Sequence, residues 1–351
     1  MKKRSTKVLI RTAASPGIGA GHVARTSAVA KALTEMGATV KWACDVSTMP
    51  YLSSQRVSQD DVRILEHAAT EGRSGEVELP PNAQRDDALR ALPEAGSFQP
   101  DVVLLDSYLL GATWQRVARD RGAWVAVFDD LMDRRIDADL IINAAGSTDE
   151  YASLAPGTTL LCGLSFAVTT AEPTDVPSLE EPGSLLISFG AADPHDATSR
   201  TLLALEALRT KFPQFEAWVQ LGGGARHRDS VSDLVKELGW ARMLGPSDAI
   251  DARARGVSLS IGAAGVSLYE RMRDGIPSIV VPLAPNQSRI ARAAESRGAA
   301  LLAGSAEASA SIALELRTSL PRLREMSAAG RAAIDGLGAR RIADTIRVCC
   351  R

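Results

Sequence analysis

The chain has 351 residues, of which 45% are hydrophobic and 23% charged, as is typical of a soluble globular protein of about two domains. Its formal net charge of -2 and its 4% aromatic content argue against binding to nucleic acid or to an anionic membrane surface. No apolar run approaches the roughly 18 residues of a membrane-spanning helix, and the four cysteines lack metal-ligand spacing, so we expect a reduced, cytoplasmic protein without membrane insertion.

Short apolar runs alternate with helical stretches through the first half of the chain. The first run, after a basic start, is interrupted at Arg11, which favours a strand over a signal peptide. Expected strands cover 7–12, 39–44, 101–107, 124–130 and 139–144, with helical stretches such as 23–36 and 113–121 between them. This alternation predicts βαβ units around a parallel sheet. Residues 53–98 have patchy periodicity and a Pro80-Pro81 break, so we expect an irregular, partly mobile segment.

The second half repeats the same alternation. Expected strands cover 184–190, 215–222, 241–245, 257–265, 278–283 and 299–304, and the tail from Pro321 has helical composition. Residues 167–184 contain three prolines and no apolar period, which is typical of a linker. We therefore expect an α/β fold of two Rossmann-like parallel-sheet lobes, 1–166 and 185–351. Ligands of such sheets bind beyond the carboxyl ends of the strands, which places the expected site in a cleft between the lobes.

The first candidate loop follows the first strand and reads RTAASPGIGAGH. Glycines such as Gly19 and Gly21 let the backbone adopt positive φ and approach a ligand. His22 falls in the first turn of the next helix, whose positive end disfavours an imidazolium ion. We expect a neutral His22 that accepts a proton as a general base. The same residues also fit a capping histidine on a closely packed helix.

The stretch GAGHVA, 19–24, also satisfies the dinucleotide pattern G-x-G-x-x-G/A. Asp45 follows the second expected strand, where a ribose-binding acid would lie. A nicotinamide-dependent oxidoreductase is therefore an alternative, and it predicts NAD binding. This pattern explains neither the histidine nor the loops of the second half.

Polar residues end the next buried strand, in the stretch LLDSY. A carboxylate at Asp106 and a phenol at Tyr108 are suited to orienting His22 or binding substrate hydroxyls. A capping aspartate and a tyrosine at the edge of the core are the structural alternative.

Three acids, Asp129, Asp130 and Asp133, have the DDxxD spacing that binds magnesium when it lies on a helix. Here they follow a strand of an α/β chain. We expect them to cap the next element or to pair with Arg134 and Arg135, with a small gain in stability if exposed.

Small residues follow two strands of the second half. Ser188 and Gly190 lie between a strand and a helix, where backbone N–H groups form a nest for an anion such as a diphosphate. Nearby Asp193 and His195 lack the further ligands of a metal site. The turn 262–265 likewise leaves room for a phosphate or a ribose.

Three polar residues after strands of the second half are further candidates for ligand binding. Glu270, in the first two turns of the helix after the 262–265 turn, is suited to accept hydrogen bonds from both ribose hydroxyls. Asn286 and Gln287 follow another buried strand, where side-chain amides can recognise the polar edges of a ligand.

A family resemblance is carried, in chain order, by RTAASPGIGAGHVAR, LLDSY, FDDL, ISFGAADP, SIGAAGVSLYER and NQ. The set resembles the nucleotide-sugar hydrolase of the bacterial pseudaminic acid pathway, which cleaves UDP from UDP-2,4-diacetamido-2,4,6-trideoxy-β-L-altropyranose. The resemblance covers roughly residues 8–304. It implies a fold like that of GT-B glycosyltransferases, including the lipid II-forming N-acetylglucosaminyltransferase, and no metal or other cofactor.

The resemblance also implies roles for individual residues. His22 matches the catalytic histidine, Tyr108 an active-site tyrosine, and Glu270 the ribose-binding acid, while Gly190 and 262–267 match the diphosphate cradle. With the chemistry of the residues themselves, the predicted catalytic set is His22, Asp106 and Tyr108. The predicted substrate-binding set is Gly19, Gly21, Ser188, Gly190, Ala264, Gly265, Val266, Ser267, Glu270, Asn286 and Gln287.

Two positions depart from the family pattern. Ala13 stands where the family usually has an acid. Ala191 stands where the family turn has a second glycine, and an alanine at positive φ costs on the order of 1 kcal/mol.

The expected activity is hydrolysis of a UDP-linked amino or deoxy sugar, by attack of water on the anomeric carbon with His22 as base, in a monomer or weak homo-oligomer. The first alternative is a glycosyltransferase that passes the sugar to an acceptor. The second, prompted by Ala13, is a sensor that binds a sugar nucleotide without turnover.

Overall fold

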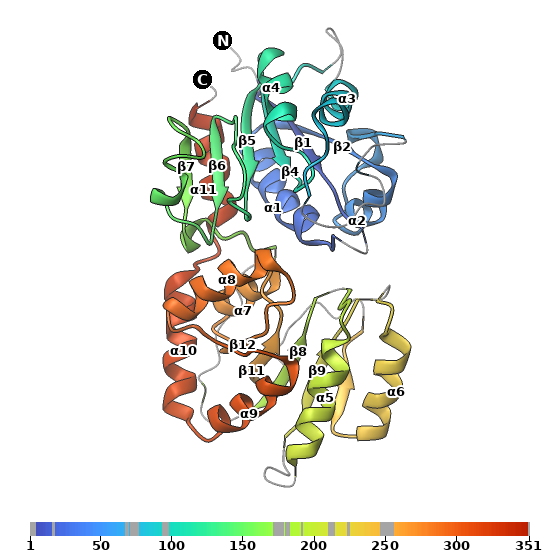
Figure 1. Ribbon diagram of the computed structural model, residues 1–351, viewed down its shortest axis with the longest axis vertical. Coiled ribbons are helices and arrows are strands. Elements are labelled where there is room, and N and C mark those ends of the chain that lie inside the picture. The colour runs from blue at the N-terminus through green and yellow to red at the C-terminus, as the bar shows by residue number, and fades with distance from the viewer. Residues whose placement is uncertain are drawn as a thin grey trace. The chain divides into compact units, whose positions relative to one another are not determined.

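The computed structural model (Figure 1) describes residues 5–15, 18–66, 70, 77–92, 98–170, 179, 183–190, 192–209, 215–222, 225–245 and 256–349. The chain forms two compact units. Unit 1 comprises Met1–Thr170 and Leu337–Arg351, and unit 2 comprises Ala171–Gly336. Each unit is built on its own parallel sheet, as the alternating pattern predicts.

Unit 1 contains a seven-stranded sheet in the order β3-β2-β1-β4-β5-β6-β7, with every neighbouring pair parallel. Its strands are β1 (Lys7–Thr12), β2 (Thr39–Cys44), β3 (Val62–Ile64), β4 (Val102–Asp106), β5 (Trp124–Phe128), β6 (Leu140–Asn143) and β7 (Thr159–Cys162). Its helices are α1 (Gly21–Glu35), α2 (Met49–Ser54), α3 (Pro81–Ala91), α4 (Ala112–Asp120) and α11 (Gly338–Cys349).

The sheet of unit 1 is covered on both faces. All five residues of β4 are buried, and its four apolar residues alternate between two apolar clusters. Val103 and Leu105 pack with Trp114 of α4, whereas Val102 and Leu104 belong to the cluster that includes residues of α1 and α11. A parallel sheet needs such cover because its strands are apolar on both sides.

Unit 2 contains a six-stranded sheet in the order β10-β9-β8-β11-β12-β13, also parallel throughout. Its strands are β8 (Ser184–Ser188), β9 (Ala217–Gln220), β10 (Ala241–Met243), β11 (Val257–Gly262), β12 (Ser278–Val280) and β13 (Ala300–Leu302). Its helices are α5 (Ala197–Leu208), α6 (Arg228–Leu238), α7 (Val266–Arg273), α8 (Pro285–Ser296), α9 (Ala306–Arg317) and α10 (Leu320–Ala333).

The segment 53–98 differs from its sequence-based expectation. We predicted an irregular segment, but it contains the edge strand β3 and the helix α3. Pro81 lies in the first turn of α3, where its missing N–H costs nothing and its fixed φ suits a helix. The proline pair therefore begins a helix instead of interrupting one. Residues 67–69, 71–76 and 93–97 lie outside the described part of this segment.

The chain's last helix belongs to unit 1, whereas the sequence pattern predicts one lobe over residues 185–351. α11 packs against α1, and Figure 1 shows α11 within this unit. Ile342 and Ile346 are fully buried there, and the backbone of Gly338 approaches the carbonyl of Ala167 so closely that a Cβ would lie 2.1 Å from its oxygen. Of the predicted linker, residues 171–178 and 180–182 lie outside the described residues.

Within the described ranges, no helix combines the length and apolarity needed to cross a membrane.

The packing of α11 predicts the cost of truncating its buried face. Ile342→Ala should lower the free energy of unfolding by about 2–5 kcal/mol, because it leaves a cavity in a fully buried site. Val348 lies on the same helix with 61% of its surface exposed, so Val348→Ala should change it by no more than about 0.5 kcal/mol. Urea unfolding of both variants measures the difference. Equal effects would show that α11 is not anchored in this core.

Candidate functional site

The glycine loop after β1 places His22 at the beginning of a helix, as predicted. Gly19 has φ +86°, a conformation open to glycine at little cost, and its N–H donates to the carbonyl of Ser15 at 2.7 Å. α1 then begins at Gly21, and His22 is 6% exposed. Pro16 and Gly17 of this loop lie outside the described residues.

His22 meets the carboxylate that ends the neighbouring strand. β1 and β4 are adjacent and parallel, with Thr12 opposite Asp106, so the loop after β1 and the end of β4 lie at the same edge of the sheet. His22 Nδ1 forms a short hydrogen bond with Asp106 Oδ1. Arg25, one helical turn further along α1, donates from Nε to Oδ2 and from Nη2 to Oδ1 of Asp106, both at 2.7 Å.

The cluster continues to the end of β5. Arg25 Nη1 donates to Asp130 Oδ2 at 2.7 Å, and the hydroxyl of Tyr108 donates to the same oxygen at 2.7 Å. The rings of His22 and Tyr108 lie edge to face, with centroids 4.5 Å apart. The structure thus brings together His22, Asp106 and Tyr108 of the predicted set and adds Arg25 and Asp130. We refer to these five residues as the histidine cluster.

The charges of the histidine cluster are set by burial and pairing together. Burial alone would raise the pKa of the Asp106 carboxyl, but the charges of Arg25 and His22 outweigh it and hold the pKa at about 2. For the Arg25 guanidinium, burial alone would lower the pKa, but the charges of the carboxylates Asp106 and Asp130 outweigh it and raise the pKa. Asp106 is therefore an anion and Arg25 a cation throughout the physiological pH range.

This arrangement fixes which imidazole nitrogen is available for chemistry. An ionised carboxylate only accepts hydrogen bonds, so Nδ1 of His22 carries the proton shared with Asp106. In the neutral ring the lone pair then lies on Nε2. The histidine cluster can therefore accept a proton at Nε2 of His22, which is the capacity of a general base.

The remaining acids of the DDxxD stretch have structural roles. Asp129 accepts hydrogen bonds from the N–H groups of Leu131 and Met132 and from the hydroxyl of Tyr151, while exposed Asp133 pairs with Arg134. The expected arginine pairing is confirmed for Asp133, whereas Asp129 holds the loop after β5 and caps no helix, since the next element is the strand β6. In the described part of the chain, no group of three or more His, Cys, Asp or Glu residues is arranged to hold a metal ion.

Asp45, the ribose-binding acid of the dinucleotide alternative, already accepts hydrogen bonds from the chain itself. Asp45 is 1% exposed. Its Oδ1 accepts from the N–H and hydroxyl of Thr48 and from the hydroxyl of Ser47, and its Oδ2 accepts from the hydroxyl of Thr70. These bonds hold the loop after β2 in place. The carboxylate is not presented to a ribose.

In unit 2, the loops after β8 and β11 adjoin. The two strands are parallel neighbours with Ser188 opposite Gly262, and a Cβ on Gly262 would lie 2.0 Å from the Ser188 carbonyl oxygen. Only glycine fits this approach. The hydroxyl of Ser188 donates to Gln220 Oε1 at 2.9 Å, so the predicted phosphate-binding serine is held by a side chain at the end of β9.

The helices that follow these two loops differ in how their N-termini are used. At α5, the carboxylate of Asp193 accepts from the N–H groups of Ala197 and Thr198 at 2.9 and 2.8 Å, so the expected anion nest there already holds an anion from the chain itself. At α7, the N-cap Gly265 has no side-chain capping hydrogen bond. The 262–267 turn is therefore the better placed of the two for a phosphate.

The other predicted residues of unit 2 lie at the same edge of its sheet. Gly190, with φ +92°, follows β8, and half-buried Glu270 lies on α7. Asn286 and Gln287 lie in the first turn of α8, after β12. Gln287 Oε1 accepts from the N–H of Leu283 at 2.9 Å, which fixes the turn that leads into the helix. Ala191 lies outside the described residues.

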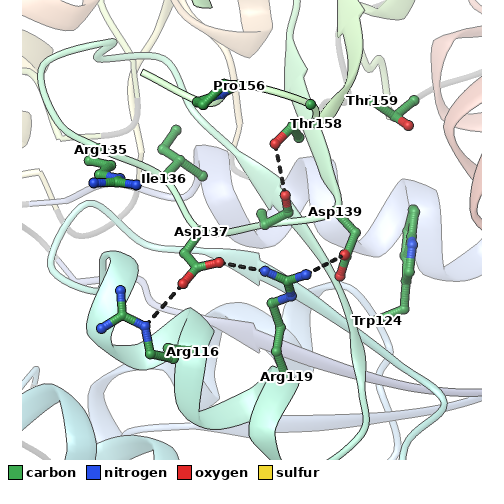
Figure 2. A pocket seen from close by; sticks show the side chains of 12 residues that line it. Arg116, Arg119, Trp124, Arg135, Ile136, Asp137, Asp139, Pro156, Thr158 and Thr159 are labelled. Carbon is green, nitrogen blue, oxygen red and sulfur yellow. Dashed lines mark hydrogen bonds and ion pairs between the residues drawn. The ribbon is translucent and has the colours of Figure 1, made fainter. Parts of the chain in front are cut away.

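A pocket of about 400 Å³ lies elsewhere in unit 1. It is lined by α4, by the segment 135–139 before β6 and by the beginnings of β5 and β7 (Figure 2). These strand beginnings lie at the edge of the sheet opposite to the strand ends that carry the histidine cluster. Asp137 bridges Arg116 and Arg119, and Arg119 also contacts Asp139. No predicted site residue lines this pocket.

Arg25, which sequence reasoning missed, carries the most contacts of the histidine cluster. Its sequence position does contain a clue. The spacing His-x-x-Arg places both side chains on one face of a helix, so an acid that orients His22 also lies within reach of Arg25. For Asp130, the sequence position alone predicts only a capping role or a pair with Arg134 or Arg135.

The chain is similar to a curated protein and to several solved structures. No family model matches the chain. It is 22% identical to the spore coat polysaccharide biosynthesis protein SpsG of Bacillus subtilis, over 72% of this chain and 77% of that protein.

Solved structures resemble the whole chain. They include MurG of Acinetobacter baumannii, with a TM-score of 0.67, 18% identity and 97% and 99% of the two chains covered. The UDP-GlcNAc 2-epimerase of Neisseria meningitidis bound to UDP-GlcNAc has a TM-score of 0.64 and 13% identity, with 98% of this chain and 100% of that chain covered. The spinosyn rhamnosyltransferase SpnG with thymidine diphosphate has a TM-score of 0.63 and 18% identity, with 99% of this chain and 100% of that chain covered. At these identities the likeness confirms the predicted α/β fold of two parallel-sheet lobes.

The pairing of Arg25 with Asp106 predicts a pH-dependent contribution to stability. The Asp106 pKa in the folded chain, about 2, is below the roughly 3.9 of an unfolded aspartate. The contribution of ionised Asp106 to the free energy of unfolding is therefore complete above pH 4 and is lost as the pH falls towards 2. Arg25→Gln removes the main cause of the shift. The difference in free energy of unfolding between wild type and Arg25→Gln should be largest near neutral pH and shrink below pH 4.

Denaturant unfolding at pH values from 2 to 7 measures this difference. Arg119→Gln is a matched control, because Arg119 also pairs with two aspartates but is 45% exposed, and its effect should stay below about 1 kcal/mol. A wild-type advantage over Arg25→Gln that did not change with pH would contradict the assignment.

Proposed function

We propose that this chain hydrolyses a UDP-linked amino or deoxy sugar and releases UDP and the free sugar. The observation that carries the proposal is the hydrogen bond from His22 Nδ1 to an ionised, fully buried Asp106, which directs the lone pair of Nε2 away from the carboxylate. The similar proteins named above supply the substrate class, since they include a UDP-GlcNAc enzyme and a sugar transferase bound to a nucleoside diphosphate.

The proposed reaction is a single displacement at the anomeric carbon. The oxygen of a water molecule forms a bond to this carbon while the bond to the diphosphate oxygen breaks, and UDP leaves with the electron pair. Nε2 of His22 takes the proton of the water, and Asp106 stabilises the imidazolium ion that results. Attack opposite the leaving group inverts the anomeric configuration.

The diphosphate is assigned to unit 2. Its leaving-group charge is stabilised by N–H groups of the 262–267 turn and by the positive end of α7, and Glu270 is assigned to the ribose hydroxyls. The base is thus assigned to unit 1 and the diphosphate to unit 2.

Transfer of the sugar to an acceptor hydroxyl is the second candidate. A histidine that deprotonates water can equally deprotonate an alcohol, and SpsG is named for polysaccharide biosynthesis while MurG and SpnG have the same fold. With a transferase, release of UDP in water alone would be slow and an added acceptor would accelerate it.

Removing the base should abolish most turnover. His22→Ala is expected to lower kcat by about 10²- to 10⁴-fold, because that is the usual contribution of a general base, and to leave UDP affinity nearly unchanged. His227→Ala, at the N-cap of α6, is the control and should retain wild-type kcat. Steady-state release of UDP and calorimetric titration with UDP measure both quantities. Near-wild-type turnover by His22→Ala would exclude His22 as the base.

The product of the reaction distinguishes the candidates. A screen of UDP- and CMP-linked sugars in ¹⁸O-labelled water, analysed by mass, should find free UDP without label and a sugar with one labelled oxygen. Label in the released nucleotide would mean attack at phosphorus and contradict the mechanism. Turnover that depends on an added acceptor would establish transfer, and binding without release of UDP would establish a sensor.

A further inference from the structure

Arg271 is a buried cation immediately behind the 262–267 turn of unit 2. It is the sixth residue of α7 and is 3% exposed. Its Nη2 donates to the carbonyl of Ala263 at 2.9 Å, its Nη1 to Ser267 Oγ at 3.3 Å and its Nε to Ser278 Oγ at 3.3 Å. All three acceptors are neutral, and two of them belong to the turn itself.

Two other arginines that are buried in the described part of the chain have a carboxylate in contact. Arg11 forms two hydrogen bonds with Asp87, at 3.0 and 2.7 Å, and Arg273, two residues after Arg271, forms two with Asp274, at 2.8 and 3.0 Å. For Arg271, no ion pair is found among the described residues. Burial lowers its pKa to about 10, while the charge of the neighbouring Glu270 opposes this shift. It is therefore still protonated at neutral pH.

A buried charge without a contacting counter-ion is costly to a fold. Hydrophobic replacement would remove that cost, so the position points to a use for the charge. The guanidinium lies one hydrogen bond from the turn whose N–H groups begin α7, and the positive end of the helix acts at the same place. Both fields favour an anion at the turn.

We propose that Arg271 is a positioning residue that selects a diphosphate at the 262–267 turn. It supplies a fixed positive charge behind the turn and holds Ala263 and Ser267 in the conformation that receives the phosphates. The arriving diphosphate is then a counter-ion for Arg271, which no residue in the described part of the chain supplies by direct contact. This inference rests on the proposed assignment of the diphosphate to unit 2. It adds that the Arg271 guanidinium is what makes the 262–267 turn prefer a charged ligand.

Two substitutions separate the charge from the hydrogen bonds. Arg271→Gln keeps an N–H donor and removes the charge, whereas Arg271→Lys keeps the charge with fewer donors. Arg273→Gln is the matched control, because Arg273 is a buried arginine of the same helix whose charge is already paired. Calorimetric titration of each protein with UDP, UMP and uridine gives the ratio of UDP to uridine affinity, and circular dichroism confirms that each variant is folded.

If the charge of Arg271 acts on the phosphates, removing it should lower the affinity for phosphorylated ligands and spare the affinity for uridine. Arg271→Gln should weaken UDP binding by roughly tenfold or more, weaken UMP less, and leave uridine within about twofold, while Arg271→Lys retains most of the UDP affinity and Arg273→Gln keeps the wild-type ratio. Equal losses for UDP and uridine would mean a structural role only, and unchanged UDP affinity would exclude any role. Either result overturns the inference while the proposed function stands.

A measurement on the wild-type protein does not depend on the folding of a variant. Inorganic pyrophosphate should compete with UDP more effectively than uridine does, because the fixed charge acts on the phosphates. Stronger competition by uridine would overturn the inference. A wild-type protein that binds no nucleoside diphosphate at all would overturn the proposed function with it.

Discussion

The short bond between His22 and the buried carboxylate of Asp106 is the interaction on which the functional account depends. A carboxylate taken out of water tends to gain a proton, and a protonated Asp106 could no longer fix the imidazole tautomer. Arg25 prevents this with two hydrogen bonds to Asp106 and extends the charge pairing to Asp130. The histidine cluster therefore combines an oriented imidazole with an Asp106 carboxylate and an Arg25 guanidinium that stay ionised at physiological pH.

The parallel sheets explain why chemistry-bearing residues separated in sequence come together within each unit. Because β1, β4 and β5 run in the same direction, the residues that follow them meet at one edge, and the same holds for β8 and β11 in unit 2. The two units use this edge differently. Unit 1 gathers an internally paired set of acids and bases, whereas unit 2 presents small residues and a helix N-terminus with an arginine behind it. A fold of this kind supports several chemistries, so the site residues and not the architecture decide among hydrolysis, transfer and binding.

Much of the fold was predictable from the sequence, because apolar runs and the helical stretches between them report burial directly. The strand at 7–12 and the placement of His22 in the first turn of α1 are confirmed. Short edge strands such as β3 carry no such pattern, and α3 was missed because Pro81 was interpreted as a break. The position of α11 depends on contacts of Ile342 and Ile346 with residues more than 300 positions away, which local periodicity cannot show. Within the site, single residues were predictable from loop position, whereas Arg25 and Arg271 gain their importance from partners that only the folded chain brings together.

The central claim is tested most directly by the tautomer of His22. Nitrogen-15 spectra of histidine-labelled protein, with the His22 resonances assigned by comparison with His22→Gln, distinguish the two ring nitrogens. The account predicts a proton on Nδ1 and an unprotonated Nε2 in the neutral ring of the wild-type protein. A proton on Nε2 would leave no lone pair facing the substrate and would contradict the account.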